Sequence, residues 1–414
     1  MATLQPVRGT HDLLPEQCRR HRAVEERCRL VAERFGYAEV ATPIFEFTEV
    51  FARTLGDTSD VVTKEMYTFE DRGGEGITLR PEGTAGVARA FISNGLQQSL
   101  PLKVFYRGPM FRYERPQKGR QRQFHQVGVE LLGVEAPMAD VEVIALGARF
   151  LDALGLKGRV TLEINTLGDQ ESREAYRTAL VDYLRGHMDR LSEDSKARLE
   201  RNPLRVLDSK DEADREIVQD APVFTDYLNE HSRTFFDTVL KGLDQLGIEY
   251  VHNTRLVRGL DYYSHTAFEF TTTELGAQGT VLAGGRYDGL IKTMGGPPTP
   301  GIGWAAGVER LALLVEDVEP FARPIAIVPL GEQAEARALT LADDLRRAEF
   351  TVDMGYSGNM KKRMQRANKV YARAAVILGE DELAKGEALV RDLDSGEQTP
   401  VPLGGLEAAL GRFR

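Results

Sequence analysis

The sequence contains few cysteines and no long apolar run. Cys18 and Cys28 are the only cysteines among 414 residues, too few for a disulfide framework and typical of a reducing compartment. No apolar stretch approaches the roughly 20 residues that a membrane helix needs. The N-terminus also lacks the apolar segment of an export signal. We therefore expect a cytoplasmic protein with no membrane partner.

Several familiar nucleotide and metal motifs are missing as well. The pattern GxxxxGK[ST] does not occur, which excludes a Walker loop as the holder of phosphates. Residues Gly301–Ala306 fit GxGxxA, but a Gly/Pro loop precedes them instead of a clear strand, which argues against a dinucleotide fold. Cys18, His21 and Cys28 lie in a helical pattern without a fourth ligand, so we expect no metal site.

A basic cluster interrupts an otherwise acidic chain. The formal net charge is −10, yet residues Lys103–His125 carry seven Lys or Arg against one acid, Glu114. An isolated charge run is more often a solvated loop. Here Arg112, Gln126 and Glu130 take ordered positions on two strand-like segments that flank the loop. This arrangement favours a bound polyanion.

The patterns along the chain predict two or three domains. Apolar spacing indicates a helix over Glu16–Arg34, and the proline in the strand Glu39–Phe45 places that strand at an edge, beside a subunit contact. A charged helical insertion should follow near residue 169, and a small α/β domain near residue 322. Shorter strands are expected at Met66–Phe69, Ile77–Arg80, Tyr250–Leu256, Ala267–Thr273, Val281–Ala283, Ile325–Leu330 and Ala374–Leu378, and helices from Thr84, over Val308–Val315 and over Gln333–Ala348.

Three arginines are candidates for phosphate chemistry without a Walker loop: Arg112 in FRYE, Arg258 in RGLDYY and Arg310 in GVERL. A guanidinium group presents a planar pair of donors and stays charged at any working pH. Each arginine alone is ambiguous. Together, with acids and tyrosines beside them, they indicate a nucleotide site built on strands.

Several segments of the chain resemble the motifs of a known family. Residues 111–114 (FRYE) with the basic loop look like motif 2 of class II aminoacyl-tRNA synthetases, residues 301–311 (GIGWAAGVERL) like motif 3, and the Pro43 strand like motif 1. Four further segments resemble histidyl-tRNA synthetases, and they are VRGT (7–10), LRPEGT (79–84), RGLDYY (258–263) and AGGRYD (283–288). The motifs occur in the family's order and span nearly the whole chain.

The resemblance implies a fold and an activity. The fold is an α+β catalytic domain with a mainly antiparallel sheet of the class II synthetase type, a helical insertion and a C-terminal α/β anticodon-binding domain, divided at residues 1–168, 169–235, 236–321 and 322–414. The activity is ATP-dependent activation of L-histidine, followed by transfer to its tRNA, with Mg²⁺ on the ATP phosphates. Motif 1 implies a homodimer.

The resemblance also assigns roles to residues. Arg112, Arg258 and Arg310 are the catalytic arginines, and with Glu114 they bind ATP. The implied histidine-binding set is Glu82, Gly83, Thr84, Arg112, Gln126, Glu130, Arg258, Tyr262 and Tyr263. The implied tRNA-binding set is Arg115, Gln117, Lys118 and Arg120 at the acceptor stem, and Lys361, Lys362 and Arg363 at the anticodon arm.

Two other classes of protein are alternatives to this interpretation. The first is a catalytically silent paralogue that serves as a regulatory subunit in histidine biosynthesis; such proteins lack the C-terminal domain and disrupt the signature around Arg258, and this chain keeps both. The second is a class II synthetase for threonine, proline or glycine, against which residues 258–263 argue.

Overall fold

The computed structural model describes residues 3–55, 61–117, 119–201, 203–207, 209, 211–257, 262–276, 279–316 and 318–414. The chain divides into two compact units, Met1–Val318 and Glu319–Arg414. The finer division of the first unit stays a prediction. Among the described helices, none is both long and apolar enough to cross a membrane.

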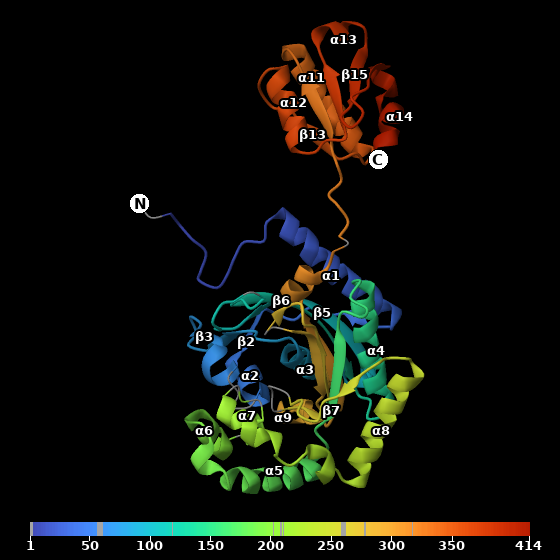
Figure 1. Cartoon of the computed structure of the whole chain (residues 1–414). Coiled ribbons are helices and arrows are strands. Elements are labelled where there is room, and N and C mark those ends of the chain that lie inside the picture. The colour runs from blue at the N-terminus through green and yellow to red at the C-terminus, as the bar shows by residue number, and fades with distance from the viewer. Residues whose placement is uncertain are drawn as a thin grey trace. The chain divides into compact units, whose positions relative to one another are not determined.

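An eight-stranded sheet forms the centre of the first unit (Figure 1). Its inner strands pair antiparallel, while the two short edge strands β1 and β8 pair parallel to their neighbours. In spatial order the strands are β1 (Ala38–Glu39), β5 (Leu102–Phe111), β6 (Gln123–Leu132), β11 (Gly301–Gly307), β10 (Thr280–Arg286), β9 (Ser264–Thr271), β7 (Thr161–Thr166) and β8 (Val251–His252). This confirms the mainly antiparallel sheet.

One face of this sheet is covered by helices α1 (Pro15–Arg34), α4 (Met138–Ala153), α8 (Glu230–Gln245) and α10 (Val308–Leu314). The principal core lies between them. Because side chains alternate along a strand, Val127 and Val129 of β6 point into this core, and Gly128 and Glu130 point to the opposite face. Trp304 of β11 stacks on Phe150 of α4 with ring centroids 5.7 Å apart.

The opposite face carries helix α3 (Thr84–Ser93), helix α2 (Thr48–Leu55), the short α9 (Leu290–Thr293) and a three-stranded sheet. The small sheet has the order β2 (Phe45–Phe47), β4 (Gly76–Leu79) and β3 (Tyr67–Glu70). These elements leave one face of the large sheet partly open, and the candidate site lies there.

Two predicted strands have clearly different bounds in the structure, and strand β11 was not predicted. The predicted strand Glu39–Phe45 divides into β1 and β2, because Pro43 has no backbone N–H for a ladder hydrogen bond. The strand predicted over Tyr250–Leu256 is only β8, Val251–His252. Residues 301–307 form strand β11 themselves, so the GxGxxA pattern lies within an antiparallel sheet and not at a strand-to-helix turn. This confirms that no dinucleotide-binding motif is present there.

The region after β7 is helical, as predicted. It contains α5 (Gln170–Arg185), α6 (Glu193–Arg201) and α7 (Glu212–Gln219), which share a core of their own around Tyr176, Leu180 and Leu184 (Figure 1). Side chains of Asp169 and Asp211 cap α5 and α7 by accepting backbone N–H groups.

The second unit has a five-stranded sheet in the order β13 (Val352–Met354), β12 (Ile325–Pro329), β14 (Ala374–Leu378), β15 (Glu387–Asp392) and β16 (Gln398–Pro402). The first three strands are parallel, and β12 and β14 are fully buried. Helices α11 (Glu332–Arg347), α12 (Met360–Lys369), α13 (Glu380–Ala384) and α14 (Leu406–Leu410) complete it. The predicted α/β domain is confirmed.

Candidate active site

A cavity of about 290 Å³ opens on the face of the large sheet opposite the principal core. Strands β5 and β6 form the long hairpin at one side of it, and β11 and β10 supply the neighbouring strands. Nine predicted site residues line the cavity, namely Glu82, Thr84, Arg112, Glu114, Arg120, Gln126, Tyr262, Tyr263 and Arg310. Residues far apart in the sequence therefore meet here.

Buried carboxylates form part of the site. Glu82 precedes α3, and its carboxylate accepts the backbone N–H groups of Thr84 at 2.6 Å and Ala85 at 2.8 Å. The Thr84 hydroxyl donates to Glu130 Oε1 at 2.6 Å, and the Tyr287 hydroxyl donates to Glu130 Oε2. Burial raises the pKa of Glu82, and it raises the pKa of Glu130 to about 8. Glu130 therefore keeps a proton to higher pH than an ordinary glutamate does.

Glycines bring the backbone close to these groups. A Cβ on Gly303 would lie 1.8 Å from Glu130 Oε2, and one on Gly83 would lie 2.2 Å from the Tyr106 ring. Gly303 pairs directly with Glu130 across β11 and β6. The absence of a side chain at both positions is thus required by packing, and the predicted role of Gly83 in binding histidine stays a prediction.

Gln126 offers an unused acceptor to the cavity. It sits on β6, on the same face as Glu130, and lines the cavity wall. Its Oε1 is buried and has no hydrogen-bond partner within the described part of the chain. Because a buried unpaired carbonyl oxygen is costly, this atom fits a ligand donor such as an ammonium group.

Two of the three predicted arginines reach the cavity, and both are fixed. Arg112 Nε donates to Pro81 O at 2.9 Å, and its guanidinium lies over the Phe124 ring. Arg310, at the start of α10, donates to Gly119 O at 3.1 Å and Thr280 O at 2.6 Å. Burial lowers the pKa of Arg310, although a guanidinium stays charged at neutral pH. Arg258 lies outside the described residues.

Two tyrosines close one side of the cavity. The rings of Tyr262 and Tyr263 have centroids 4.6 Å apart, and Tyr262 also meets Tyr287 edge-on at 5.7 Å. Burial raises the pKa of Tyr262 and Tyr287, so both hydroxyl groups keep their protons and can donate. Arg173 of α5 donates to Tyr263 O at 2.8 Å, which links the helical insertion to this wall.

The loop of the hairpin carries the residues predicted to meet the acceptor stem. Arg115 and Gln117 are exposed, and Gln117 and Arg120 bond to each other through their backbones at 2.9 and 3.0 Å. Arg120 Nε lies 2.7 Å from Glu114 Oε2 and lines the cavity. Arg120 thus belongs to the loop and also lines the cavity. Lys118 lies outside the described residues.

The C-terminal basic cluster requires one correction. Lys361 and Lys362 are exposed on the first turn of α12. Arg363, which was predicted to bind RNA, is only 5% exposed, and its guanidinium donates to Gly358 O at 2.7 Å, to Gly355 O and to Glu335. Its donors are used inside the unit, so Arg363 holds α12 in place and does not face RNA.

Sequence reasoning missed two features of the site. Tyr287 was noted only as part of AGGRYD, although its hydroxyl is a direct partner of Glu130. Arg286 of the same segment is fully buried and pairs with Asp140, so this motif is largely structural. Helical spacing in α1 could have identified the second feature, because His21 continues the buried stripe of Val24, Cys28 and Val31 and meets His125 and Glu309.

Comparison with known proteins agrees with this geometry. The family model described as histidyl-tRNA synthetase matches residues 9–311, and the model described as anticodon binding domain matches residues 324–412. The chain belongs to the histidyl-tRNA synthetase family. The match to the second model confirms the C-terminal anticodon-binding domain.

Individual members of this family resemble the chain over its full length. It is 67% identical over 414 residues to a histidine–tRNA ligase of Rhodospirillum rubrum and 58% identical over 414 residues to one of Gluconobacter oxydans, with complete coverage of both chains. The crystal structure of apo histidyl-tRNA synthetase from S. aureus matches with a TM-score of 0.82 and 36% identity, covering 98% of this chain and 99% of that one.

A regulatory relative shares the fold. A structure from Bacillus halodurans, described as an ATP phosphoribosyltransferase regulatory subunit/histidyl-tRNA synthetase, matches with a TM-score of 0.67 at 22% identity, over 92% of this chain and 99% of that one. At this identity the likeness concerns the fold alone. The high identity to ligases favours the enzyme over the regulator.

Proposed function

We propose that the chain is a histidine–tRNA ligase, which activates L-histidine with ATP and transfers the histidyl group to the 3′ end of its tRNA. The observation that carries this function is the meeting of two kinds of group in one cavity. Buried carboxylate and amide oxygens from Glu82 and Gln126 suit an ammonium group, and the fixed guanidinium groups of Arg112 and Arg310 suit phosphates.

The histidine ammonium is bound by Glu82, Thr84 and Gln126. The free Oε1 of Gln126 and the remaining lone pairs of the Glu82 carboxylate accept its hydrogens. The imidazole lies against Tyr262 and Tyr263. Both ring nitrogens then need polar partners, and a site built of such partners rejects amino acids that lack the matching atoms.

Glu130 influences this pocket through the side chains that it contacts. It is 1% exposed, and its hydrogen bonds to Thr84 and Tyr287 connect it to the cavity wall. Because its pKa is raised, Glu130 can carry a proton and donate it to one of these two hydroxyls, whose own hydrogen is then free for the ligand. Glu130 thereby contributes to recognition of a histidine ring that contacts Tyr287 or Thr84.

Adenylation joins the histidine carboxylate to the α-phosphorus of ATP. A carboxylate oxygen forms the new P–O bond while the bond to pyrophosphate breaks, and the electron pair leaves with pyrophosphate. Arg112 stabilises the charge at the α-phosphate and Arg310 that at the γ-phosphate end, with Arg258 as a further donor. Fixed donors of this kind are each worth about 3–4 kcal/mol in the transition state.

The site also offers oxygen ligands suited to Mg²⁺. The carboxylates of Glu114, just after β5, and Glu269 of β9 both line the cavity, and hard carboxylate oxygens are the donors that Mg²⁺ takes beside nucleotide phosphates. Bound with ATP, the ion would neutralise phosphate charge. The arginines position the phosphates whether or not the ion is bound.

Transfer to tRNA uses surfaces in both units. The exposed Arg115 and Gln117, with Lys118 and Arg120, meet the acceptor stem, and the exposed Lys361 and Lys362 meet the anticodon arm. These contacts are mostly to phosphates, so binding weakens as salt rises.

The chain acts as a cytoplasmic homodimer. Apolar side chains are exposed beside the small sheet, with Ile44 42%, Phe45 53%, Phe47 53% and Phe69 50% accessible. A cluster of this kind is typical of a subunit interface. Light scattering that gives the mass of one chain would contradict this assembly.

The experiment that tests the function is charging of histidine tRNA. Purified protein, ATP, Mg²⁺ and radiolabelled histidine should give acid-precipitable histidyl-tRNA, and a non-cognate tRNA should remain uncharged. The regulatory paralogue predicts no charging at all. Absence of product from correctly folded protein would therefore overturn the proposal.

A further inference from the structure

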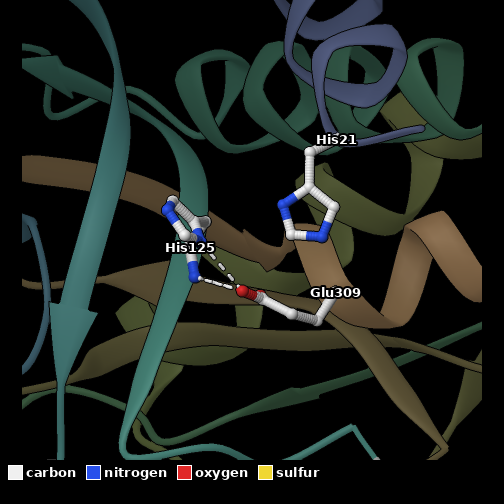
Figure 2. Close-up of side chains that lie close together, drawn as sticks. All are labelled: His21, His125 and Glu309. Carbon is white, nitrogen blue, oxygen red and sulfur yellow. Dashed lines mark hydrogen bonds and ion pairs between the residues drawn. The ribbon is translucent and has the colours of Figure 1, made fainter. Parts of the chain in front are cut away.

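A second cluster of chemically active side chains lies at the edge of the principal core, and one of its members, Glu309, also lines the cavity. His21 comes from α1, His125 from β6 and Glu309 from the first turn of α10 (Figure 2). One nitrogen or oxygen from each of the three lies within 4.8 Å of the others. These residues belong to three separate elements, so the fold brings them together.

The alternation of β6 explains why His125 points away from the cavity although its neighbours Phe124 and Gln126 line it. His125 has the same orientation as Val127 and Val129, which enter the core beneath α1. Gln126, Gly128 and Glu130 face the cavity instead. On α1, His21 precedes Val24 and Cys28 on the buried stripe. The two histidines therefore meet at the edge of the principal core.

We propose that His21, His125 and Glu309 bind a divalent transition metal ion of the Zn²⁺ type. Two imidazoles and one carboxylate are a ligand set that zinc takes, with water or another donor in the fourth position. Imidazole nitrogen disfavours Mg²⁺, which prefers hard oxygen ligands. This ion is therefore different from any magnesium that enters the cavity with ATP.

The first independent observation is the unused nitrogen of His21. The side chain is 8% exposed, and its Nδ1 is buried without a hydrogen-bond partner among the described residues. A buried polar atom of this kind usually has a partner, and a metal ion would supply it.

The second observation is the spacing of the other two ligands. His125 Nδ1 lies 2.9 Å from Glu309 Oε1, and the same carboxylate accepts the backbone N–H of His125 at 2.9 Å from each oxygen. Ligands about 2.0–2.1 Å from a tetrahedral ion lie roughly 3.3 Å apart. The histidine and the glutamate thus need only a small shift to share an ion, in place of the proton between them.

The rings are arranged so that both can reach the carboxylate. Their centroids are 5.4 Å apart with an angle of 76° between the ring planes. Figure 2 shows the His21 ring and the His125 ring on two sides of the Glu309 carboxyl group. An ion at their meeting point would connect α1, β6 and α10. Since Arg310 follows Glu309 directly, the ion would also anchor the helix that carries this cavity arginine.

Zn²⁺ titration of the full-length protein in the presence of Mg²⁺ tests the proposal. Isothermal titration should find one Zn²⁺ site per chain, Co²⁺ at the site should show visible ligand-field bands, and saturation should raise the melting temperature. In His21→Phe, which keeps a ring of similar size without a lone pair, affinity should fall by more than roughly 100-fold, the upper end of the loss from an outer-shell change.

Two matched variants separate this site from others. Cys18→Ser removes an exposed thiol three residues from His21, and His252→Asn removes an exposed histidine elsewhere in the same unit. Both should bind Zn²⁺ like the unaltered chain. If the His21→Phe variant does not fold, the His21→Gln variant is titrated in its place. Equal Zn²⁺ affinity in the His21 variant and the unaltered chain, or no binding to the unaltered chain, would overturn the proposal.

Discussion

At the scale of single residues, burial decides what the site can do. Glu82 and Glu130 are buried, and Gln126 is partly buried with its Oε1 shielded from water. Buried oxygen atoms without full partners bind donors strongly, because the alternative is an unsatisfied polar group. Two predictions follow from these side chains.

The first concerns Gln126. Replacement by leucine keeps a similar volume and removes the free acceptor, so the KM for histidine should rise by about 10- to 100-fold, the value of one hydrogen bond to a charged group. The matched control is Gln123→Leu, an exposed residue on the opposite face of the same strand. Steady-state pyrophosphate exchange measures both variants. An unchanged KM in Gln126→Leu would remove this residue from the ammonium site.

The second concerns the pH dependence of stability through Glu130. Its pKa is about 8 in the folded protein, against 4.5 for the ordinary side chain. Between these values the folded state holds a proton that the unfolded state has lost, so this group makes folding less favourable as pH rises. The Glu130→Gln variant does not titrate. Its unfolding free energy minus that of the unaltered chain should therefore increase from pH 5 to pH 8.

Urea denaturation of the two proteins at several pH values measures this difference. Contributions from His21, His125 and Glu82 occur in both proteins and largely cancel. A difference that stays constant over this pH range would show that Glu130 is ionised throughout, and the hydroxyls of Thr84 and Tyr287 would then have a different role.

At the scale of elements, strand register places the site. Because β6 and β11 pair with Glu130 opposite Gly303 and Gln126 opposite Gly307, the glycines of β11 leave room for the polar side chains of β6. The hairpin β5–β6 was predictable from alternation and charge. The pairing of β11 with the free edge of β6 was not predictable, because the Gly/Pro segment before β11 concealed the strand.

Gly303→Ala tests this register. The new Cβ would lie 1.8 Å from Glu130 Oε2 and 2.4 Å from Val129 O, so the strands would have to separate. We expect a loss of about 1–3 kcal/mol in unfolding free energy and a large loss of activity. Gly307→Ala on the same strand is the control, since its nearest neighbour would be 3.9 Å away. Equal stability of the two variants would contradict the packing described here.

The helix α12 gives a prediction for tRNA. Reversing two exposed charges with Lys361→Glu and Lys362→Glu should raise the KM for tRNA by roughly 10-fold or more, through lost phosphate contacts. Pyrophosphate exchange should be unchanged, because it needs no tRNA. The control is the pair Lys385→Glu and Arg391→Glu, exposed charges elsewhere in the same unit. An unchanged KM for tRNA would remove α12 from the RNA surface.

At the scale of the whole molecule, the sequence predicts the division into a mainly antiparallel catalytic unit and a C-terminal α/β unit. Alternation and buried apolar runs such as Ile325–Leu330 report local structure directly. The structural role of Arg363 could not be predicted, because exposed and buried arginines look alike in a basic run. The partners of Glu130 and the meeting of His21 with His125 depend on contacts between distant segments, which no local pattern reports.

The central claim is that one cavity joins histidine to ATP. Amino-acid-dependent exchange of pyrophosphate into ATP, run with each amino acid separately, tests it most directly. Exchange should occur with histidine and fall to background with the others. Exchange driven by a different amino acid would contradict the specificity of the cavity, and no exchange with histidine would contradict the adenylation itself.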